Sequence, residues 1–254
     1  MSDPPPVPPT PPTPPSPPIT PPPTPPPLPS LPAAERVRIA YQRRPETDYV
    51  FSFWTALGWT VLTCGIFGYY VVYQLVRRMR EHNRRRLDLL EASIGFAWEQ
   101  AQRRPAVADE LRPTFESMAG NLGVLRQMTS DFRDPAVWTL LAFLTGGIAT
   151  VVAFVLLDGD LVRHTAAERA VQADLGRVYL RLGQDLGPDE GPADAAVKGR
   201  HNYGGRIAAS LASFGIYLLW WYRDVMVEAN RHFAEDWAWE DRLGAAVYYL
   251  AHPS

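Results

Sequence analysis

The stretch Thr63-Cys64-Gly65-Ile66, which His82 follows after fifteen intervening residues, occurs in three versions along the chain. The other two are Thr145-Gly146-Gly147-Ile148 with His164, and Ser213-Phe214-Gly215-Ile216 with His232. The copies are offset by 82 and 68 residues, a spacing too unequal for a stacked solenoid. The pattern therefore indicates one helical unit that is duplicated, with insertions of variable length between the copies.

Each copy lies in an apolar run. Residues 51–76, 136–157 and 207–222 contain no charged side chain. About 20 apolar residues are enough to cross the roughly 30 Å hydrocarbon core of a bilayer. The third run has only 16 residues and could instead be a buried core helix, but its aromatic end suits a headgroup layer. The sequence thus predicts an all-α integral membrane protein with three transmembrane helices.

The rest of the chain is divided by composition. Residues 4–32 contain 19 prolines, which excludes a helix and favours a disordered tether or, as the alternative, a PxxP ligand. A heptad seam beyond the first run indicates coiled-coil packing; it comprises Leu87, Leu90, Ile94, Ala97 and Ala101. The predicted segments are a proline-rich tail (1–34), a basic juxtamembrane segment (35–50), transmembrane helices (51–76, 135–157, 203–223), an extramembrane helical hairpin (77–134), an amphipathic helix with a Gly/Pro/Asp loop (158–202) and an amphipathic C-terminal helix (224–254).

Two of the copies continue with aromatic residues, as Gly65-Ile66-Phe67-Gly68-Tyr69-Tyr70 and Gly215-Ile216-Tyr217-Leu218-Leu219-Trp220. In this respect the chain resembles the bacterial integral-membrane family catalogued as domain of unknown function 4234, whose signature is Thr-x-Gly-Ile-Tyr followed by Tyr or Trp. The resemblance covers the apolar runs and implies a membrane location without implying an activity or a cofactor. Arginine supplies all but one of the 25 basic residues, which also suggests a GC-rich bacterial genome. The expected location is the bacterial inner (plasma) membrane, with several crossings.

Small and polar residues of the repeat receive separate roles. Small side chains let neighbouring membrane helices approach closely, and the residues expected to form this packing face are Gly65, Gly68, Gly147, Ser213 and Gly215. Polar and basic residues near the ends of the spans are expected at the headgroup level; they are Arg77, Arg78, His82, His164, Arg231 and His232. Anionic lipid headgroups are the predicted partners of the arginines.

The three histidines raise the alternative of a metal site, because three imidazoles suit zinc. Seventeen helical residues rise about 25 Å, so each histidine is expected near the exit of its span. If each repeat crosses once, His164 leaves on the opposite side from His82 and His232. Exits on opposite sides exclude a joint site, and the sequence therefore predicts no metal and no cofactor. Convergence of His82 and His232 with a carboxylate would instead favour a membrane enzyme.

Sequence motifs for phosphate binding, nucleophilic catalysis or paired-cysteine metal binding are absent. A formal net charge of −2 also argues against nucleic acid as a partner. The prediction is a non-enzymatic membrane scaffold or interaction subunit that contacts the lipid bilayer and either a second copy or another membrane protein. A small transporter or channel component is the alternative.

Overall fold

The computed structural model describes residues 31–187 and 201–252, and within these ranges all regular elements are α-helices. The helices are α1 (Ala33–Gln42), α2 (Arg44–Thr47), α3 (Phe53–Leu62), α4 (Ile66–Gln102), α5 (Pro105–Ser130), α6 (Pro135–Leu144), α7 (Ile148–Arg181), α8 (Tyr203–Ala212) and α9 (Ile216–Ala251). The predicted proline-rich tail up to residue 30, and the part of the predicted loop at 188–200, lie outside the described residues.

Each copy of the repeat is a tight turn between a short helix and a long one: α3–α4, α6–α7 and α8–α9. Two successive residues in each turn adopt positive φ. The first are Cys64, Gly146 and Phe214 at 51°, 60° and 51°, and the second are Gly65, Gly147 and Gly215 at 94°, 94° and 89°. Two left-handed residues reverse the chain, and glycine tolerates this conformation because it lacks Cβ. The invariant glycine of the repeat is thus explained by backbone conformation.

The hydroxyl residue of the repeat closes the turn. Thr63 Oγ1 accepts the N–H of Phe67 at 2.9 Å, and the N–H of Gly65 donates back to the Thr60 carbonyl at 2.7 Å. Both bonds recur in the other two copies, with hydroxyl contacts of 3.0 and 2.9 Å and backbone contacts of 2.8 Å. A Ser or Thr side chain in this position satisfies an N–H group at the start of a helix that would otherwise lack a partner.

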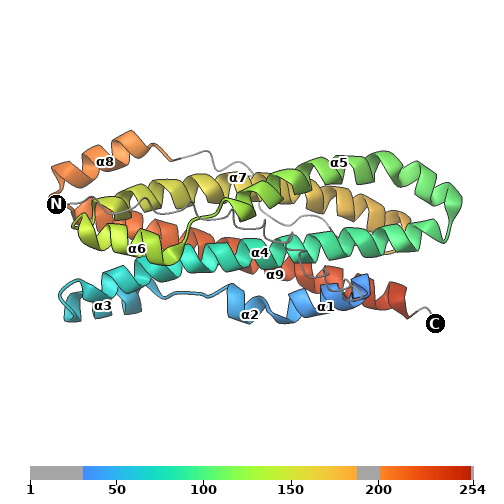
Figure 1. Cartoon of the computed structure of the whole chain (residues 1–254), viewed down its shortest axis with the longest axis horizontal. Helices are drawn as coiled ribbons and strands as arrows, with labels where there is room; N and C mark the ends of the chain where they lie inside the picture. The colour runs from blue at the N-terminus through green and yellow to red at the C-terminus, as the bar shows by residue number, and fades with distance from the viewer. Residues whose placement is uncertain (1–30, 188–200, 253–254) are drawn as a thin grey trace, which may run out of the picture. The chain divides into compact units, whose positions relative to one another are not determined.

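The long helices pack side by side, and α4 contacts α1, α5, α6, α7 and α9. The three turns lie at one end of this helical unit, and the α4–α5 connection lies at the other (Figure 1). Ring contacts join neighbouring hairpins near the turns, such as Tyr69 with Phe143 at 5.5 Å and Phe53 with Tyr222 at 5.9 Å between ring centroids. As a result, α4, α7 and α9 all leave the turns in the same direction.

The interior has two apolar clusters. One is near the turns and includes Val71, Leu75, Phe154, Trp221 and Phe233. The other is farther along the long helices and includes Leu89, Leu90, Leu175, Val178 and Leu243. Between them α4, α7 and α9 contribute a buried polar layer, which contains the three histidines of the repeat.

The prediction of three transmembrane helices, and with it the multi-pass location, is wrong for this structure. Within the described ranges, no helix combines the length and the apolar character needed to cross a bilayer. The physical reason is the turn inside each apolar run. Helix α3 has only 10 residues, which extend about 15 Å, and α4 becomes charged from Arg77 onward.

Candidate metal centre

Equal spacing in the sequence places the three histidines at one level. His82, His164 and His232 each follow the glycine of their turn by 17 residues, on α4, α7 and α9. Seventeen residues of helix rise about 25 Å. Because the three helices leave neighbouring turns in the same direction, equal spacing becomes equal height. A joint site is excluded only if each repeat crosses the membrane once, and that assumption is wrong because each repeat reverses the chain.

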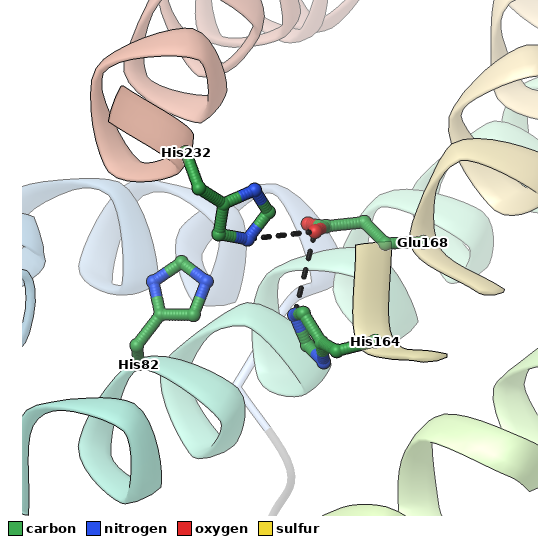
Figure 2. A group of neighbouring side chains, drawn as sticks. All are labelled: His82, His164, Glu168 and His232. Carbon is green, nitrogen blue, oxygen red and sulfur yellow. Dashed lines mark ion pairs between the residues drawn. The ribbon is translucent and has the colours of Figure 1, made fainter. Parts of the chain in front are cut away.

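The three imidazoles and one carboxylate converge in the interior (Figure 2). The ring centroids of the histidines are 5.3–5.8 Å apart in all three pairs. Glu168, one helical turn after His164, places Oε2 at 3.3 Å from His164 Nε2 and 3.6 Å from His232 Nε2. One donor atom from each of the four residues lies within 4.8 Å of all the others. None of the four residues is more than 7 % exposed.

Asp48 sets the orientation of the His82 ring. Its Oδ1 lies 2.9 Å from His82 Nδ1, and both side chains are fully buried. Burial would raise the pKa of Asp48, but His82, Arg85 and Trp237 outweigh it and hold the pKa below its usual value. An ionised carboxylate only accepts hydrogen bonds, so Nδ1 carries the proton and Nε2 keeps its lone pair. Pairing of this kind is typical of histidines that bind metals.

Several polar atoms of this cluster are buried without a hydrogen-bond partner among the described residues. They are His82 Nε2, both ring nitrogens of His164, Glu168 Oε2, His232 Nε2 and Asp236 Oδ2. A buried polar atom without a partner costs about 1–3 kcal/mol, so a native interior rarely holds a group of them. Coordination of one cation would satisfy the ring nitrogens and the carboxylate together, and the residues present therefore fit a metal ion.

The charges of the buried polar layer also favour a bound cation. Arg85 donates to Asp48 Oδ2 at 2.7 Å, and both Arg85 and Arg86 donate to Glu240 Oε1 at 2.8 Å. Arg86 further pairs with Glu168 and lies 3.4 Å from Asp236. Four buried carboxyl groups thus face two guanidinium groups, a formal excess of two negative charges when all are ionised. A bound cation would offset this excess.

The protonation states reduce that formal excess, because the raised pKa of Asp236 favours its neutral form and leaves three carboxylates facing two guanidinium groups. Burial lowers the pKa of His82 and lowers that of His232 well below its usual value, so both rings are neutral near pH 7. For Glu168, burial acts to raise the pKa, but Arg86 and His164 outweigh it and hold the pKa well below its normal range. Burial, reinforced by the neighbouring carboxylates, raises the pKa of Asp236 well above its usual value. Neutral imidazoles and an ionised Glu168 are the forms that bind metals.

The donor set selects a class of metal. Three imidazole nitrogens and one carboxylate oxygen suit Zn²⁺ and related first-row divalent ions, whereas Mg²⁺ and Ca²⁺ prefer oxygen ligands. Tetrahedral zinc with bonds near 2.0 Å requires about 3.3 Å between ligand atoms. The contacts of Glu168 Oε2 with His164 and His232, at 3.3 and 3.6 Å, are close to this value.

A second group, Asp158, His201 and Glu228, is less suited to a metal. His201 Nδ1 lies 2.5 Å from Asp158 Oδ1, and its Nε2 lies 3.3 Å from Glu228 Oε1. Tyr203 donates to the other oxygen of Asp158 at 2.6 Å. This group is less buried than the first, and both oxygens of Asp158 already contact described partners, His201 and Tyr203, so it is explained as an ion-paired cluster.

The residues assigned to the headgroup level have different environments. Arg77 and Arg231 are exposed, whereas His82, His164 and His232 line the interior. Arg78 is also buried and donates to the Tyr49 carbonyl at 3.2 Å and to Asn230 Oδ1 at 2.7 Å.

The glycines and serine assigned to a packing face act mainly within the turns. Among the described residues, a Cβ added at Gly65, Gly147 or Gly215 would meet no atom within 4 Å. Gly68 alone of the predicted glycines lies close to a neighbour, with Thr60 Cγ2 at 3.4 Å from such a Cβ. Ser213 uses its hydroxyl to accept the N–H of Tyr217 at 2.9 Å.

The site residues predicted from the sequence do not include Asp48, Arg85, Glu168, Asp236 or Glu240. A signal for two of them was present, because a carboxylate follows the histidine by four residues in the second and third repeats. Residues four apart share one face of a helix, so Glu168 and Asp236 accompany their histidines into the layer. Asp48 precedes the first repeat and had no comparable signal.

No protein-family model matches the chain, and no curated protein or solved structure is similar to it. The resemblance to the family of domain of unknown function 4234 therefore stays a prediction.

Proposed function

We propose that the protein is a non-enzymatic helical scaffold whose interior is held together by one divalent transition-metal ion, with zinc as the leading candidate. The ligands are His82, His164, His232 and Glu168. The observation that carries the proposal is the convergence of their donor atoms within 4.8 Å, several of them buried without hydrogen-bond partners in the part of the chain that the structure describes.

The enclosure of the site favours a structural metal over a catalytic one. Catalytic zinc sites keep one position open to water or substrate, whereas structural sites are closed by protein ligands. Here the four ligand residues are at most 7 % exposed and come from three helices that belong to different repeats. The ion would therefore join α4, α7 and α9. The alternative role as a transporter or channel component stays a prediction that no contact of this site favours.

Metal titration tests the proposal. We expect the purified full chain, after treatment with a chelator, to bind one Zn²⁺ per chain in competition with a chromophoric chelator. Bound Co²⁺ should give the intense visible absorption of a four-coordinate site. Glu168→Gln, which keeps the size of the side chain, should weaken binding by more than the roughly 10–100-fold typical of losing an outer-shell partner.

His252→Ala is the matched control, because His252 is exposed, its ring nitrogen and its ring face contact Tyr248, and it lies outside the buried layer. It should bind metal as the unchanged chain does. Circular dichroism of each metal-free variant separates loss of ligand from loss of fold. Absence of stoichiometric binding by the unchanged chain, or equal binding by Glu168→Gln, would show that the cluster is not a metal site. Two ions per chain would implicate the His201 group as well.

A further inference from the structure

The three turns carry large apolar side chains that extend into solvent. The isoleucines after the turn glycines, Ile66, Ile148 and Ile216, are 71–74 % exposed, and Phe214 is 99 % exposed. Leu62, Leu144 and Leu211, which precede the turns, are exposed as well. All three turns lie at one end of the helical unit (Figure 1). Large apolar side chains that are exposed together at one end of the helical unit mark a contact site.

The short helices α3, α6 and α8 bury very few of their side chains. Helix α8 has no buried residue, α3 buries only Phe53 and Ala56, and α6 buries only Pro135 and Ala142. A protein partner normally covers one stripe of an amphipathic helix. Three separate apolar tips that are exposed on several sides suit a fluid apolar medium, which can surround each tip.

The backbone N–H groups of the turns do not need water as a hydrogen-bond partner. Each N–H group in 63–68, 145–150 and 213–218 donates to an acceptor within its own hairpin. The acceptors include the side-chain hydroxyls of Thr63, Thr145 and Ser213. Water could satisfy these groups in an ordinary exposed turn, whereas hydrocarbon cannot. The Ser/Thr of the repeat is therefore needed most if the tip enters lipid.

The distribution of charge is complementary to a phospholipid leaflet. The apolar runs carry no charge, and paired ions of both signs begin at their ends. Arg80 pairs with Asp134 at 3.2 Å, Arg206 pairs with Asp224 at 2.9 Å, and Arg133 pairs with Asp160. Such pairs match a zwitterionic headgroup layer. Helix α3, which has 10 residues, extends about 15 Å, half of the roughly 30 Å hydrocarbon core.

We propose that the three hairpin tips insert together into one leaflet of a zwitterionic phospholipid surface and do not cross it. The proposal is independent of the metal site, which lies about 25 Å along the helices from the turns. Trp54, which is 73 % exposed near the base of the first hairpin, would lie at the headgroup level where tryptophan is favoured.

The single cysteine provides a direct test, because Cys64 lies exposed in the first turn. A fluorophore on Cys64 should shift to the blue when phosphatidylcholine vesicles are added, and lipids brominated on their acyl chains should quench it. The matched control carries Cys64→Ser with Leu180→Cys, which moves the label to an exposed position at the far end of α7. That label should show neither effect.

A second variant measures the affinity. Phe214→Asp should lower partitioning into these vesicles about 100-fold, because a charge in hydrocarbon costs roughly 3 kcal/mol. Leu180→Asp should leave partitioning unchanged. Because the Phe214 side chain is almost fully exposed, its replacement should preserve the helical circular dichroism.

Three results would overturn the proposal. One is an aqueous environment for the Cys64 label in the presence of vesicles. Another is self-association through the tips, detected by light scattering and by excimers of a pyrene label without lipid. The third is binding that requires anionic lipid and disappears in high salt, which would assign the contact to exposed basic residues such as Arg77.

Discussion

At the scale of single residues, Asp48 shows how an outer carboxylate prepares a metal ligand. It accepts from His82 Nδ1 at 2.9 Å, from Arg85 at 2.7 Å and from Trp237 Nε1 at 2.7 Å. These donors keep the carboxylate ionised and immobile. The carboxylate in turn fixes the tautomer and the direction of the His82 ring.

Asp48→Asn should therefore weaken Zn²⁺ binding about 10–100-fold, the usual effect of losing an outer-shell partner. An amide can present its NH₂ group to His82 Nδ1, which would favour the wrong tautomer. Competition with a chromophoric chelator measures the change. Asp241→Asn, which alters the half-exposed partner of Arg44, is the control and should leave the affinity unchanged. Equal affinities for the two variants would contradict the role given to Asp48.

At the scale of elements, the left-handed turn determines what each repeat is. Apolar periodicity is the same for one helix of 26 residues and for two shorter helices joined by a turn, so it predicted a single span at 51–76. Among apolar neighbours the glycine predicts close helix packing, although its φ near 90° is the feature that breaks the helix. After the turn, the apolar spacing does predict the buried face of α4, because Leu90, Ala97 and Ala101 of the heptad seam are fully buried.

Gly215→Ala should destabilise the protein by about 1–2 kcal/mol, because an L-residue with a Cβ is disfavoured in the left-handed region. Its φ of 89° lies well inside that region. Gly120→Ala is the control, since it lies within α5 and a Cβ there would meet no described atom within 4 Å. That substitution should stabilise by roughly 0.5–1 kcal/mol. Urea unfolding followed by circular dichroism measures the free energy of unfolding of each variant. If both substitutions destabilise the protein, or if neither does, the left-handed conformation of Gly215 is not what the turn requires.

At the scale of the whole helical unit, the polar layer separates two apolar clusters and connects α4, α7 and α9. Without a cation, several of its buried polar atoms have no hydrogen-bond partner among the described residues, and burial raises the pKa of Asp236. The layer is therefore the part of the interior whose stability depends most on a bound ion.

Metal should thus stabilise the folded chain by mass action. Free Zn²⁺ at 100 times its dissociation constant contributes about 2.7 kcal/mol if the unfolded chain does not bind it. Thermal unfolding should shift upward on loading and return after chelation. Hydrogen exchange should slow most around His82, His164 and His232, and less at the far end of α5. Protection spread evenly over all helices, or none, would argue against a local metal link.

The sequence by itself determined the all-helical class, the three copies and the 17-residue interval between glycine and histidine, because these are local properties of composition and spacing. Tertiary structure decided which ends of the copies meet. Two residues of positive φ reverse each repeat, and packing of the three hairpins at one end turns equal spacing into a single layer. The sign of φ at Cys64 or Phe214 has no signature in apolar periodicity. The recruitment of Asp48, which is 34 residues from His82, depends on contacts that only the packed helices create.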